Sequence, residues 1–433
     1  MKIALLNDTE CFENIGSQLT SGCLKRAVLE AFSHQASEVA MESWPWKWGK
    51  HSARIRSFLT SLPFFLGGKR NDASFLRWLK VLSRNEYGRA AYGSALSSDV
   101  VIFQPEGSFY ECDDIHKLTS ILSLPTLCQR LGKPVVCLNG TFPEYRDSRA
   151  ILISSFLREC RWVALRDRWS AEYYKADFIP DLAFSYRPQI PNSGRATRRS
   201  NSVLITTGAR FSKKRNMELT RVALDFCRKE DLQPLVLTKL GFHVEGLRSE
   251  IESMNGRLIL RSNLSDAATL VDQCCLHIGG RYHMAILALT LSIPSVLVRT
   301  NTHKNEWLSS EITGIELAQT EAQIPKLGKR LLNQSHRFKA DISKDLERMR
   351  SAIAINMPHL RAQLRNDGTE HHEAVTLNDG RSLEEQLELS TLAGALVRDQ
   401  KMRLHKTFRH LRMKVLLAKR KVVPFSIFRA GQA

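Results

Sequence analysis

The sequence lacks a long apolar run. Nowhere in its 433 residues do about eighteen apolar residues follow one another, the length that a helix needs to cross a bilayer. The chain also begins with a strand-like apolar segment at residues 2–6 and not with the basic and apolar regions of a signal peptide. From these two absences we expect a cytoplasmic protein without a membrane-spanning helix.

Paired cysteines and clustered metal ligands are missing as well. The nine cysteines are scattered without a Cys-x-x-Cys pair, and Cys137, Cys274 and Cys275 lie in strand-like or apolar runs. This distribution favours buried, reduced thiols over a zinc site or a disulfide framework. Because Asp and His residues do not pair at ligand spacing either, we expect metal-independent chemistry without a cofactor.

Acidic residues are too few to balance the basic ones. The chain has 63 Lys and Arg against 44 Asp and Glu, a formal net charge of +19. Such an excess favours an acidic partner, which can be nucleic acid, anionic lipid or a phosphorylated substrate. The sequence carries no RNA-binding signature, and we expect no nucleic-acid partner.

Basic residues concentrate near the C-terminus. Between residues 398 and 422 many Lys and Arg accompany apolar residues at helical spacing, with Asp399 as the lone acid. This pattern predicts a basic amphipathic helix, which either lies on an anionic membrane surface or docks on the protein with a solvated basic face. We favour peripheral association with the inner face of the plasma membrane.

A second basic segment, residues 44–95, is rich in aromatic residues. Trp44, Trp46 and Trp48 open it, and further Phe and Trp residues alternate with Lys and Arg. Rings among cations suit a lipid interface, a sugar-stacking platform or single-stranded nucleic acid, and rings can also simply pack under a long insertion. We interpret the segment as an insertion on the acceptor or membrane side.

Short apolar runs alternate with periodic helical segments along the chain, which predicts an α/β protein with two Rossmann-like domains facing across a cleft. Strands are expected at residues 2–7, 38–42, 99–104, 134–138, 162–165, 178–179, 202–206, 234–238, 257–260, 275–278 and 295–298. Helices are expected between them, for example at 18–32, 115–131 and 149–160.

The same alternation suggests where the domains end. We predict an N-terminal domain at 1–186, a polar linker at 187–201, a C-terminal domain at 202–335 and a helical extension at 336–433 that includes the basic tail. The charged helical region after residue 320 is expected to pack across both domains. Pro358 is expected to break a helix there.

One strand-turn-helix junction has the chemistry of an anion site. A buried strand at 275–278 runs into Gly279 and Gly280, and Arg281 and His283 then open an Ala/Leu-rich helix. The free N–H groups and positive dipole end of such a helix favour a phosphate or carboxylate, and arginine can add a bidentate grip. The alternative is a tight turn with a surface arginine.

The surroundings of this junction resemble a known family. The segments that carry the resemblance are Asn14-Ile15-Gly16-Ser17, Leu131-Gly132-Lys133-Pro134-Val135-Val136, the run from Ala164 through Arg166-Asp167 to Ser170, Pro180-Asp181-Leu182-Ala183-Phe184, and Gly280-Arg281-Tyr282-His283 with Ile293-Pro294 and Lys304. Together and in this order they resemble the polysaccharide pyruvyl transferase family. The resemblance implies a glycosyltransferase-B-like fold and transfer of the enolpyruvyl group of phosphoenolpyruvate to a sugar, forming a cyclic ketal.

That reaction requires cations for the donor, an acid for its methylene carbon and a base for the attacking hydroxyl. The candidate donor-binding residues are Arg166, Arg210, Gly280, Arg281, Tyr282 and His283. The candidate acceptor-binding residues are Asn14, Gly16, Ser17 and Glu106. His283 is the candidate proton donor, and Glu106 and Asp181 are the candidate bases. We expect a lipid-linked oligosaccharide or polysaccharide as acceptor.

Two departures from the family pattern keep other functions open. Ser17 stands where many relatives have an acid, and Glu106-Gly107 replaces a glycine cluster. One alternative is a nucleotide-sugar-dependent glycosyltransferase of the same architecture, with a diphosphate at Arg281 and His283. The other is a non-catalytic member of a polysaccharide assembly complex. The transferase hypothesis requires Arg166 and Arg281 to converge on one cleft.

Overall fold

The computed structural model describes residues 1–10, 14–32, 39–44, 86–113, 115–189, 201–208, 211–239, 241, 244–260, 262–300 and 302–365. The chain divides into two compact units, one formed by Met1–Asn71 with Ala90–His371 and the other by Asp72–Arg89 with His372–Ala433. Only residues 86–89 of the second unit are described.

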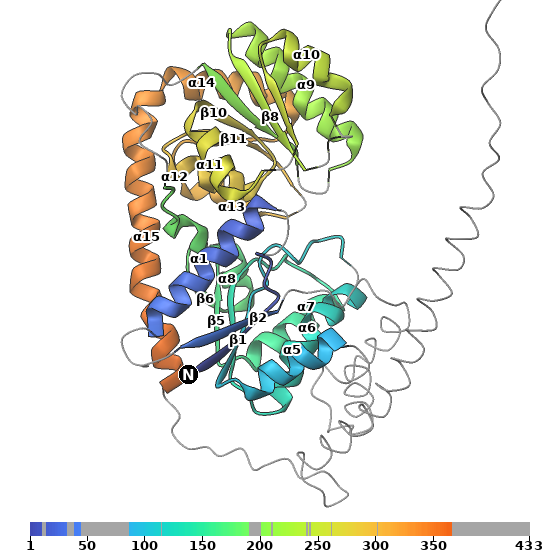
Figure 1. The fold of residues 1–433 in the computed structure, drawn as a ribbon, viewed down its shortest axis with the longest axis vertical. Helices are drawn as coiled ribbons and strands as arrows, with labels where there is room; N and C mark the ends of the chain where they lie inside the picture. Colours follow the sequence, from blue (N-terminus) through green and yellow to red (C-terminus); the bar gives the residue numbers. More distant parts are fainter. Residues whose placement is uncertain are drawn as a thin grey trace, which may run out of the picture. The chain divides into compact units, whose positions relative to one another are not determined.

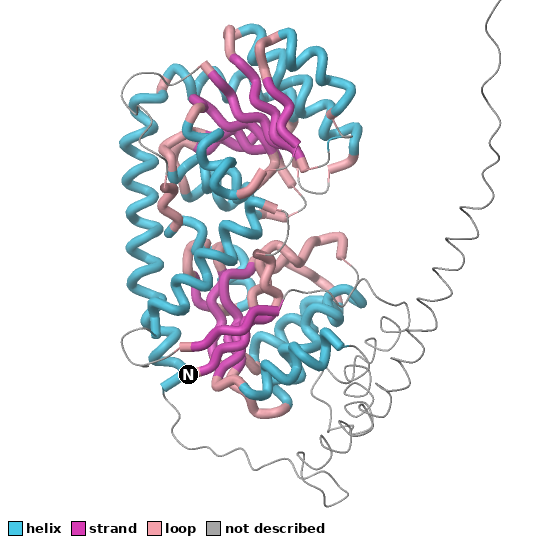
Figure 2. Tube along the Cα trace, in the orientation of Figure 1, coloured by secondary structure: helices cyan, strands magenta, loops and turns pink. Residues whose placement is uncertain are grey.

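The first part of the first unit is built on a parallel sheet of six described strands in the order β2-β1-β3-β4-β5-β6 (Figures 1 and 2). The strands are β1 (Lys2–Leu6), β2 (Ala40–Trp44), β3 (Val100–Phe103), β4 (Val135–Gly140), β5 (Trp162–Leu165) and β6 (Asp177–Phe178). The helices between them are α1 (Ile15–Phe32), α5 (Glu86–Ser97), α6 (Ile115–Arg130), α7 (Ser148–Arg158) and α8 (Arg168–Tyr174), followed by the 3₁₀ helix η2 (Leu182–Ser185).

A second parallel sheet of six described strands follows, in the order β12-β11-β10-β7-β8-β9. Its strands are β7 (Ser202–Thr206), β8 (Gln233–Thr238), β9 (Arg257–Leu260), β10 (Cys274–Gly279), β11 (Ser295–Val298) and β12 (Ile315–Ala318). Its helices are α9 (Lys213–Lys229), η4 (Glu245–Leu247), α10 (Arg248–Ser253), α11 (Leu264–Asp272), α12 (Tyr282–Thr290), α13 (Lys304–Glu311), η5 (Glu321–Gln323) and α14 (Ile324–Asn333). The two sheets confirm the predicted Rossmann-like architecture.

Inner strands of both sheets are buried because helices cover both faces of each sheet. Every residue of β3, β4, β7 and β11 is buried, as expected for strands of a parallel sheet that is packed on two sides. Helix α6 contacts β3 and β4 in the first sheet, and α9 contacts β7 and β8 in the second. Because these strands appear in the sequence as continuous apolar runs, they could be predicted from it.

The strand orders define where ligands can bind. In each sheet, chain connections run in opposite directions from one central pair of strands, β1 and β3 in the first sheet and β7 and β10 in the second. Open parallel sheets bind ligands at the carboxyl ends of strands beside such a switch point, because the adjacent loops leave a crevice there. The residues that follow β1, β3, β7 and β10 are therefore the first candidates for a site.

A single long helix contacts both sheets' helices. Helix α15 (Ser335–Arg365) packs against α1 and η2 and also against α12 and α14 (Figure 1). Arg350 Nε donates to the Phe184 carbonyl (3.1 Å), and Asp345 Oδ2 accepts the Thr313 N–H (2.8 Å). The prediction that the charged region after residue 320 packs across both domains is confirmed for this helix.

The prediction that Pro358 breaks a helix is wrong. Pro358 lies inside α15 on its exposed side. The buried side chains of Ile353, Met357 and Leu360 pack into the core on either side of the proline. Their burial outweighs the missing N–H and the steric conflict that proline brings to a helix interior.

Other predictions from the sequence have mixed outcomes. Strand β12 was not predicted, because the edge segment Ile315–Ala318 is short and contains Glu316. The insertion 44–95 is described only at Trp44 and from residue 86 onward, and the linker 187–201 only at its ends. The basic segment 398–422 lies outside the described residues. The domain boundaries remain predictions.

Candidate functional site

A cavity of about 240 Å³ lies at the carboxyl ends of the strands of both sheets. Loops after β1 and β3 supply Asn14, Ile15, Gly16, Glu106, Gly107 and Tyr110. The second sheet and its loops supply Thr206, Thr207, Leu237, Thr238, Lys239, Ser262, Arg281, Tyr282, His283, Met284 and Lys304. The cavity thus joins the two switch points of the fold.

Two glycines bring β10 close to β7 at this cavity. A Cβ on Gly279 would lie 2.0 Å from Thr206 Oγ1, and a Cβ on Gly280 would lie 2.8 Å from the Cα of Gly208. Any larger residue would therefore push the two strand ends apart. The close approach places the start of α12 directly over the end of β7.

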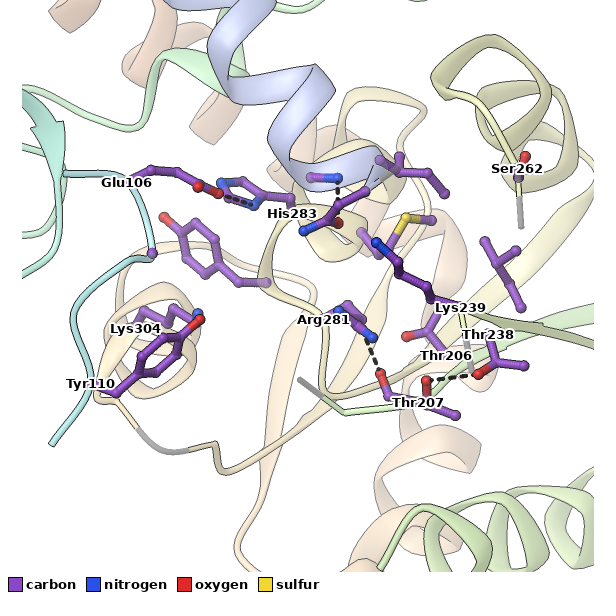
Figure 3. A pocket seen from close by; sticks show the side chains of 17 residues that line it. Glu106, Tyr110, Thr206, Thr207, Thr238, Lys239, Ser262, Arg281, His283 and Lys304 are labelled. Carbon is purple, nitrogen blue, oxygen red and sulfur yellow. Dashed lines mark hydrogen bonds and ion pairs between the residues drawn. The ribbon is translucent and has the colours of Figure 1, made fainter. Parts of the chain in front are cut away.

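Arg281 is the N-cap residue of α12, and His283 lies in the first helical turn. The Arg281 Nε donates to the carbonyl oxygen of Thr207 at 3.1 Å, which fixes the guanidinium across the cavity wall (Figure 3). Burial lowers the pKa of Arg281, and the nearby Tyr110 opposes this shift. Burial and the backbone contact thus leave the guanidinium fixed in the wall that faces a ligand.

In Figure 3, Glu106, Tyr110 and Lys304 lie on one side of Arg281, and a second group of lining residues lies on the other side. We call the side with Glu106, Tyr110, Lys304, Arg281 and His283 the anion end. We call the opposite side, formed by Thr206, Thr207, Thr238, Lys239 and Ser262, the hydroxyl end.

His283 lies between two carboxylates. Its Nδ1 is 4.0 Å from Glu106 Oε1, and its Nε2 is 3.3 Å from Asp181 Oδ2 and 3.1 Å from Arg166 Nη1. A Cβ on Gly16 would lie 2.6 Å from His283 Nδ1. Gly16, in the first turn of α1, is therefore required for the observed position of the imidazole.

Arg166 and Asp181 form a buried ion pair behind His283. Both side chains are 0% exposed, and Arg166 Nη1 lies 2.8 Å from Asp181 Oδ2. Thr20 also donates to Asp181 and Thr141 accepts from Arg166. Although burial raises the pKa of Asp181, the Arg166 charge and His283 outweigh it, so the pKa lies well below its ordinary value. Asp181 is thus a fixed negative charge.

Two buried donors beside the anion end have no hydrogen-bond partner among the described residues. Arg166 Nη2 and the Tyr282 hydroxyl are buried without a hydrogen bond to the described residues. Arg166 Nη2 and Lys304 Nζ each lie 3.8 Å from the point where a Cβ of Gly107 would stand. Two cationic groups therefore flank one position that glycine leaves empty.

Lys304 is buried at 8% exposure and lines the cavity. Burial is the main cause that lowers its pKa to about 8, and the Arg166 charge adds to the shift. An anion bound at this place would relieve both effects, because it supplies the countercharge that the described residues provide only through Glu106 and Asp181.

Glu106 has a strained backbone. Its φ is 44°, in the left-handed region that favours glycine. The residue is 8% exposed and its side chain points to His283 (Figure 3). Strained residues of this kind often occur at functional sites, so the backbone of Glu106 makes it a candidate functional residue.

The structure places the sequence-predicted site residues in three groups. Asn14, Gly16, Glu106, Arg281, Tyr282 and His283 line the cavity. Arg166 and Asp181 lie behind it, Gly280 supports the turn and Ser17 is buried in α1. Arg210 lies outside the described residues. Arg166 thus contacts His283 from the first sheet, and Arg281 lines the cavity from the second. Arg166 itself is buried behind the cavity wall.

Two neighbouring residues have structural roles. Asp167 accepts the Ser170 N–H as the N-cap of α8. Its Oδ1 also lies 2.7 Å from His303 Nε2. His303 precedes Lys304 and so positions the start of α13.

Sequence reasoning assigned no role to Lys304, Tyr110, Thr207, Thr238 or Lys239, which all line the cavity. Lys304 belongs to the family-like segment, and Thr207, Thr238 and Lys239 come at or just after the ends of β7 and β8. Position at a strand end beside a switch point was the signal that could have identified the last three.

The described residues contain no group of three or more His, Cys, Asp or Glu side chains arranged to hold a metal ion. Within the same residues, no helix is both long and apolar enough to cross a bilayer. The groups that can hold a ligand are therefore the cations, hydroxyls and helix N-termini around the cavity.

Two parallel Rossmann-like sheets with a polar cavity at their switch points define a glycosyltransferase-B-like fold. A family model described as "Polysaccharide pyruvyl transferase" matches residues 14–302. The chain belongs to this family of transferases. No curated protein matches the chain.

Solved structures share the fold at low sequence identity. The UDP-GlcNAc 2-epimerase from Neisseria meningitidis has 12% identity and a TM-score of 0.54, and the match covers 84% of this chain and 100% of that one. The alpha,alpha-trehalose 6-phosphate synthase from Burkholderia multivorans has 10% identity and a TM-score of 0.51, with coverage of 84% and 98%. These similarities concern the fold alone.

Proposed function

We propose that the protein transfers the enolpyruvyl group of phosphoenolpyruvate to a sugar of a surface polysaccharide and forms a pyruvate ketal. The observation that carries the proposal is that Arg281 and Lys304 line one cavity. His283 stands there between Glu106 and Asp181, with the buried Arg166 directly behind it. A small donor with a phosphate and a carboxylate matches these charges.

The anion end supplies donors for both anionic groups. Lys304 Nζ and Arg166 Nη2 flank the space over Gly107, and Arg281 stands at the N-terminus of α12. Helix α1 begins at the same cavity, with Asn14 Oδ1 accepting the Gly16 N–H at 3.2 Å. Positive side chains and helix N-termini stabilise phosphate and carboxylate oxygens.

His283 is placed to donate the proton that starts the reaction. In the proposed step the donor's C2=C3 electron pair takes a proton from the imidazolium, so that the methylene becomes a methyl group and positive charge develops at C2. An acceptor hydroxyl then forms a bond to C2 and loses its proton. Imidazole suits this task because its ordinary pKa lies near neutrality.

Glu106 is the carboxylate we assign as the base for the sugar hydroxyls, because it is the acid that lines the cavity among the described residues. A second hydroxyl then attacks C2 while the C2–O bond to phosphate breaks, which closes the ketal and releases inorganic phosphate. One hydroxyl proton replaces the proton used from His283, and the other leaves with phosphate. Asp181 keeps the imidazole and Arg166 in place.

The acceptor in this proposal is a lipid-linked oligosaccharide or polysaccharide at the inner face of the plasma membrane. Support comes from the net charge of +19 and from the basic segments 44–95 and 398–422. Basic segments with apolar residues bind anionic lipid surfaces. Peripheral membrane association of a cytoplasmic protein is thus part of the same proposal.

The test is to incubate the protein with phosphoenolpyruvate and extracted lipid-linked glycans. We expect release of inorganic phosphate together with a glycan whose mass has risen by one pyruvate ketal. Arg281→Met should abolish both signals, whereas Lys326→Met, an exposed lysine on α14, should leave them unchanged. Binding of UDP-GlcNAc with release of UDP, and no binding of phosphoenolpyruvate, would instead support a nucleotide-sugar glycosyltransferase.

A further inference from the structure

The proposed donor occupies only the anion end of the cavity, and the hydroxyl end is a separate group of polar residues. Thr206, Thr207, Thr238, Lys239 and Ser262 line it on the far side of Arg281 (Figure 3). We propose that the hydroxyl end binds the phosphate groups of the acceptor and that the acceptor is a glycosyl diphosphate. This inference rests on the proposed pyruvyl transfer and names the substrate class that the same cavity takes.

The position of these residues favours a ligand. Thr206 ends β7 and Thr238 ends β8, so their side chains lie at the carboxyl edge of the sheet where parallel folds bind phosphorylated ligands. The hydroxyls of Thr207 and Thr238 are buried and lie 3.3 Å from each other. They form a fixed pair of polar groups in the cavity wall.

Charge at the hydroxyl end favours an anion over a neutral sugar. Lys239 is exposed and lines the cavity. Ser262, just before α11, adds a further hydroxyl to the lining. Glu106, the acidic residue among the described lining residues, belongs to the anion end. Hydroxyl and ammonium groups together suit phosphate oxygens.

Arg281 connects the two ends. Its Nε donates to the backbone carbonyl of Thr207 at 3.1 Å, and its guanidinium borders the anion end. A diphosphate held at Thr207 and Lys239 therefore places the sugar attached to it beside His283 and Glu106. The geometry thus selects the sugar next to the diphosphate for ketal formation, because more distant sugars of a glycan would extend away from the reacting groups.

The first experiment measures two affinities by isothermal titration calorimetry with the full chain. Inorganic pyrophosphate is titrated into protein saturated with phosphoenolpyruvate, and phosphoenolpyruvate is titrated alone. We expect pyrophosphate to bind in the presence of the donor. Lys239→Met and the double variant Thr207→Val/Thr238→Val should each weaken pyrophosphate about five- to tenfold, the usual effect of losing charged or buried hydrogen bonds, and leave the donor's Kd unchanged.

Lys326→Met serves as the matched control, since it removes an equally exposed lysine outside the cavity. It should change neither affinity. Competition of pyrophosphate with phosphoenolpyruvate for one site would overturn the inference, as would an equal loss of both affinities in Lys239→Met. Failure of phosphoenolpyruvate to bind the unmodified protein would instead overturn the proposed function, whether or not pyrophosphate binds.

The second experiment identifies the source of the diphosphate. The probes are UDP-GlcNAc, N-acetylglucosamine linked through diphosphate to a farnesyl chain, and free N-acetylglucosamine, each added with phosphoenolpyruvate. We expect either diphosphate to accept a pyruvate ketal with a KM that rises about five- to tenfold in Lys239→Met. Turnover of the nucleotide or of the lipid compound decides which source is used. Equal turnover of the free sugar would overturn the inference.

Discussion

The two ends of the cavity differ in how their polar groups are held. At the anion end, Arg166, Asp181 and His283 form a connected network that is almost closed to water, and Glu106 and Lys304 are each 8% exposed. At the hydroxyl end the threonines are buried but Lys239 reaches into solvent. Charges buried in fixed positions act strongly on a bound group, whereas an exposed lysine can adapt to different ligands. We therefore assign the proposed chemistry to the anion end and adaptable ligand binding to the hydroxyl end.

Removal of Arg166 should have the largest effect on stability. Arg166→Met leaves Asp181 as a fully buried carboxylate without its cation, which typically lowers the free energy of unfolding by roughly 3 to 5 kcal/mol. Urea unfolding measures the change. Arg168→Met is the control, because Arg168 pairs with Glu311 at the surface and such pairs contribute less than about 1 kcal/mol. Equal losses in the two variants would contradict the assignment of Arg166 and Asp181 as a buried, stabilising ion pair.

Two substitutions at Glu106 should affect kcat and the free energy of unfolding differently. Glu106→Gln keeps the shape and the strained φ but removes the base, so kcat should fall about 10²- to 10⁴-fold with unchanged stability. Glu106→Gly removes the base and also relieves the strain at φ 44°, which should raise the free energy of unfolding by roughly 1 kcal/mol. Phosphate release and urea unfolding provide the readouts. Full activity in Glu106→Gln would exclude Glu106 as the base.

Gly16→Ala should reduce kcat without removing any reacting group. The new Cβ would stand 2.6 Å from His283 Nδ1, and a displacement of a catalytic group by about 1 Å can lower the rate roughly 10²-fold. Gly22→Ala on the same helix is the matched control, since its Cβ meets nothing closer than Glu10 Oε1 at 3.6 Å. Similar kcat values in both variants would show that the imidazole position is not critical.

The lowered pKa of Lys304 leads us to expect that activity with phosphoenolpyruvate depends on pH. Its pKa of about 8 means that the ammonium, and with it the attraction for the donor, is lost as pH rises through this value. The kcat/KM for phosphoenolpyruvate should therefore fall about tenfold per pH unit above about pH 8. In Lys304→Met this fall of kcat/KM with rising pH should be absent. The free energy of unfolding should rise between about pH 8 and pH 10.5, the ordinary pKa of a lysine. In this pH range the unfolded chain binds more protons than the folded chain. A flat profile up to pH 10 would contradict this assignment.

The smallest effect is expected at the hydroxyl end. Lys239→Met should change the free energy of unfolding by less than about 0.5 kcal/mol, as is usual for exposed side chains. Thermal unfolding of this variant beside Arg166→Met tests the comparison directly. A loss in Lys239→Met as large as that in Arg166→Met would mean that both ends are equally preorganised.

Much of the fold could be predicted because strands covered on both faces are read as continuous apolar runs. Strands β5, β7, β9 and β11 agree with the sequence prediction to the residue, and the family resemblance agrees with the matched family model. Edge strand β12 and the helix through Pro358 could not be predicted, because both form through packing against distant segments that local sequence does not reveal.

The site was predictable only where its residues follow a recognisable turn. The junction from Gly280 to His283 is such a turn, and its position at a helix N-terminus is confirmed. The contact of Gly16 with His283 and the burial of Lys304 join segments that are far apart in the chain. No local pattern contains that information.

By itself, the sequence determined the two α/β alternations, the strand-end turns that carry Arg281 and Glu106, and the excess of positive charge. These features depend on local backbone preferences and side-chain chemistry. Only the tertiary structure decided that Arg166 pairs with Asp181 behind His283, that Lys304 is buried, and that Thr207 and Thr238 form one polar wall. Pairing, burial and the resulting pKa shifts depend on which distant segments meet, and that is settled by packing of the whole unit.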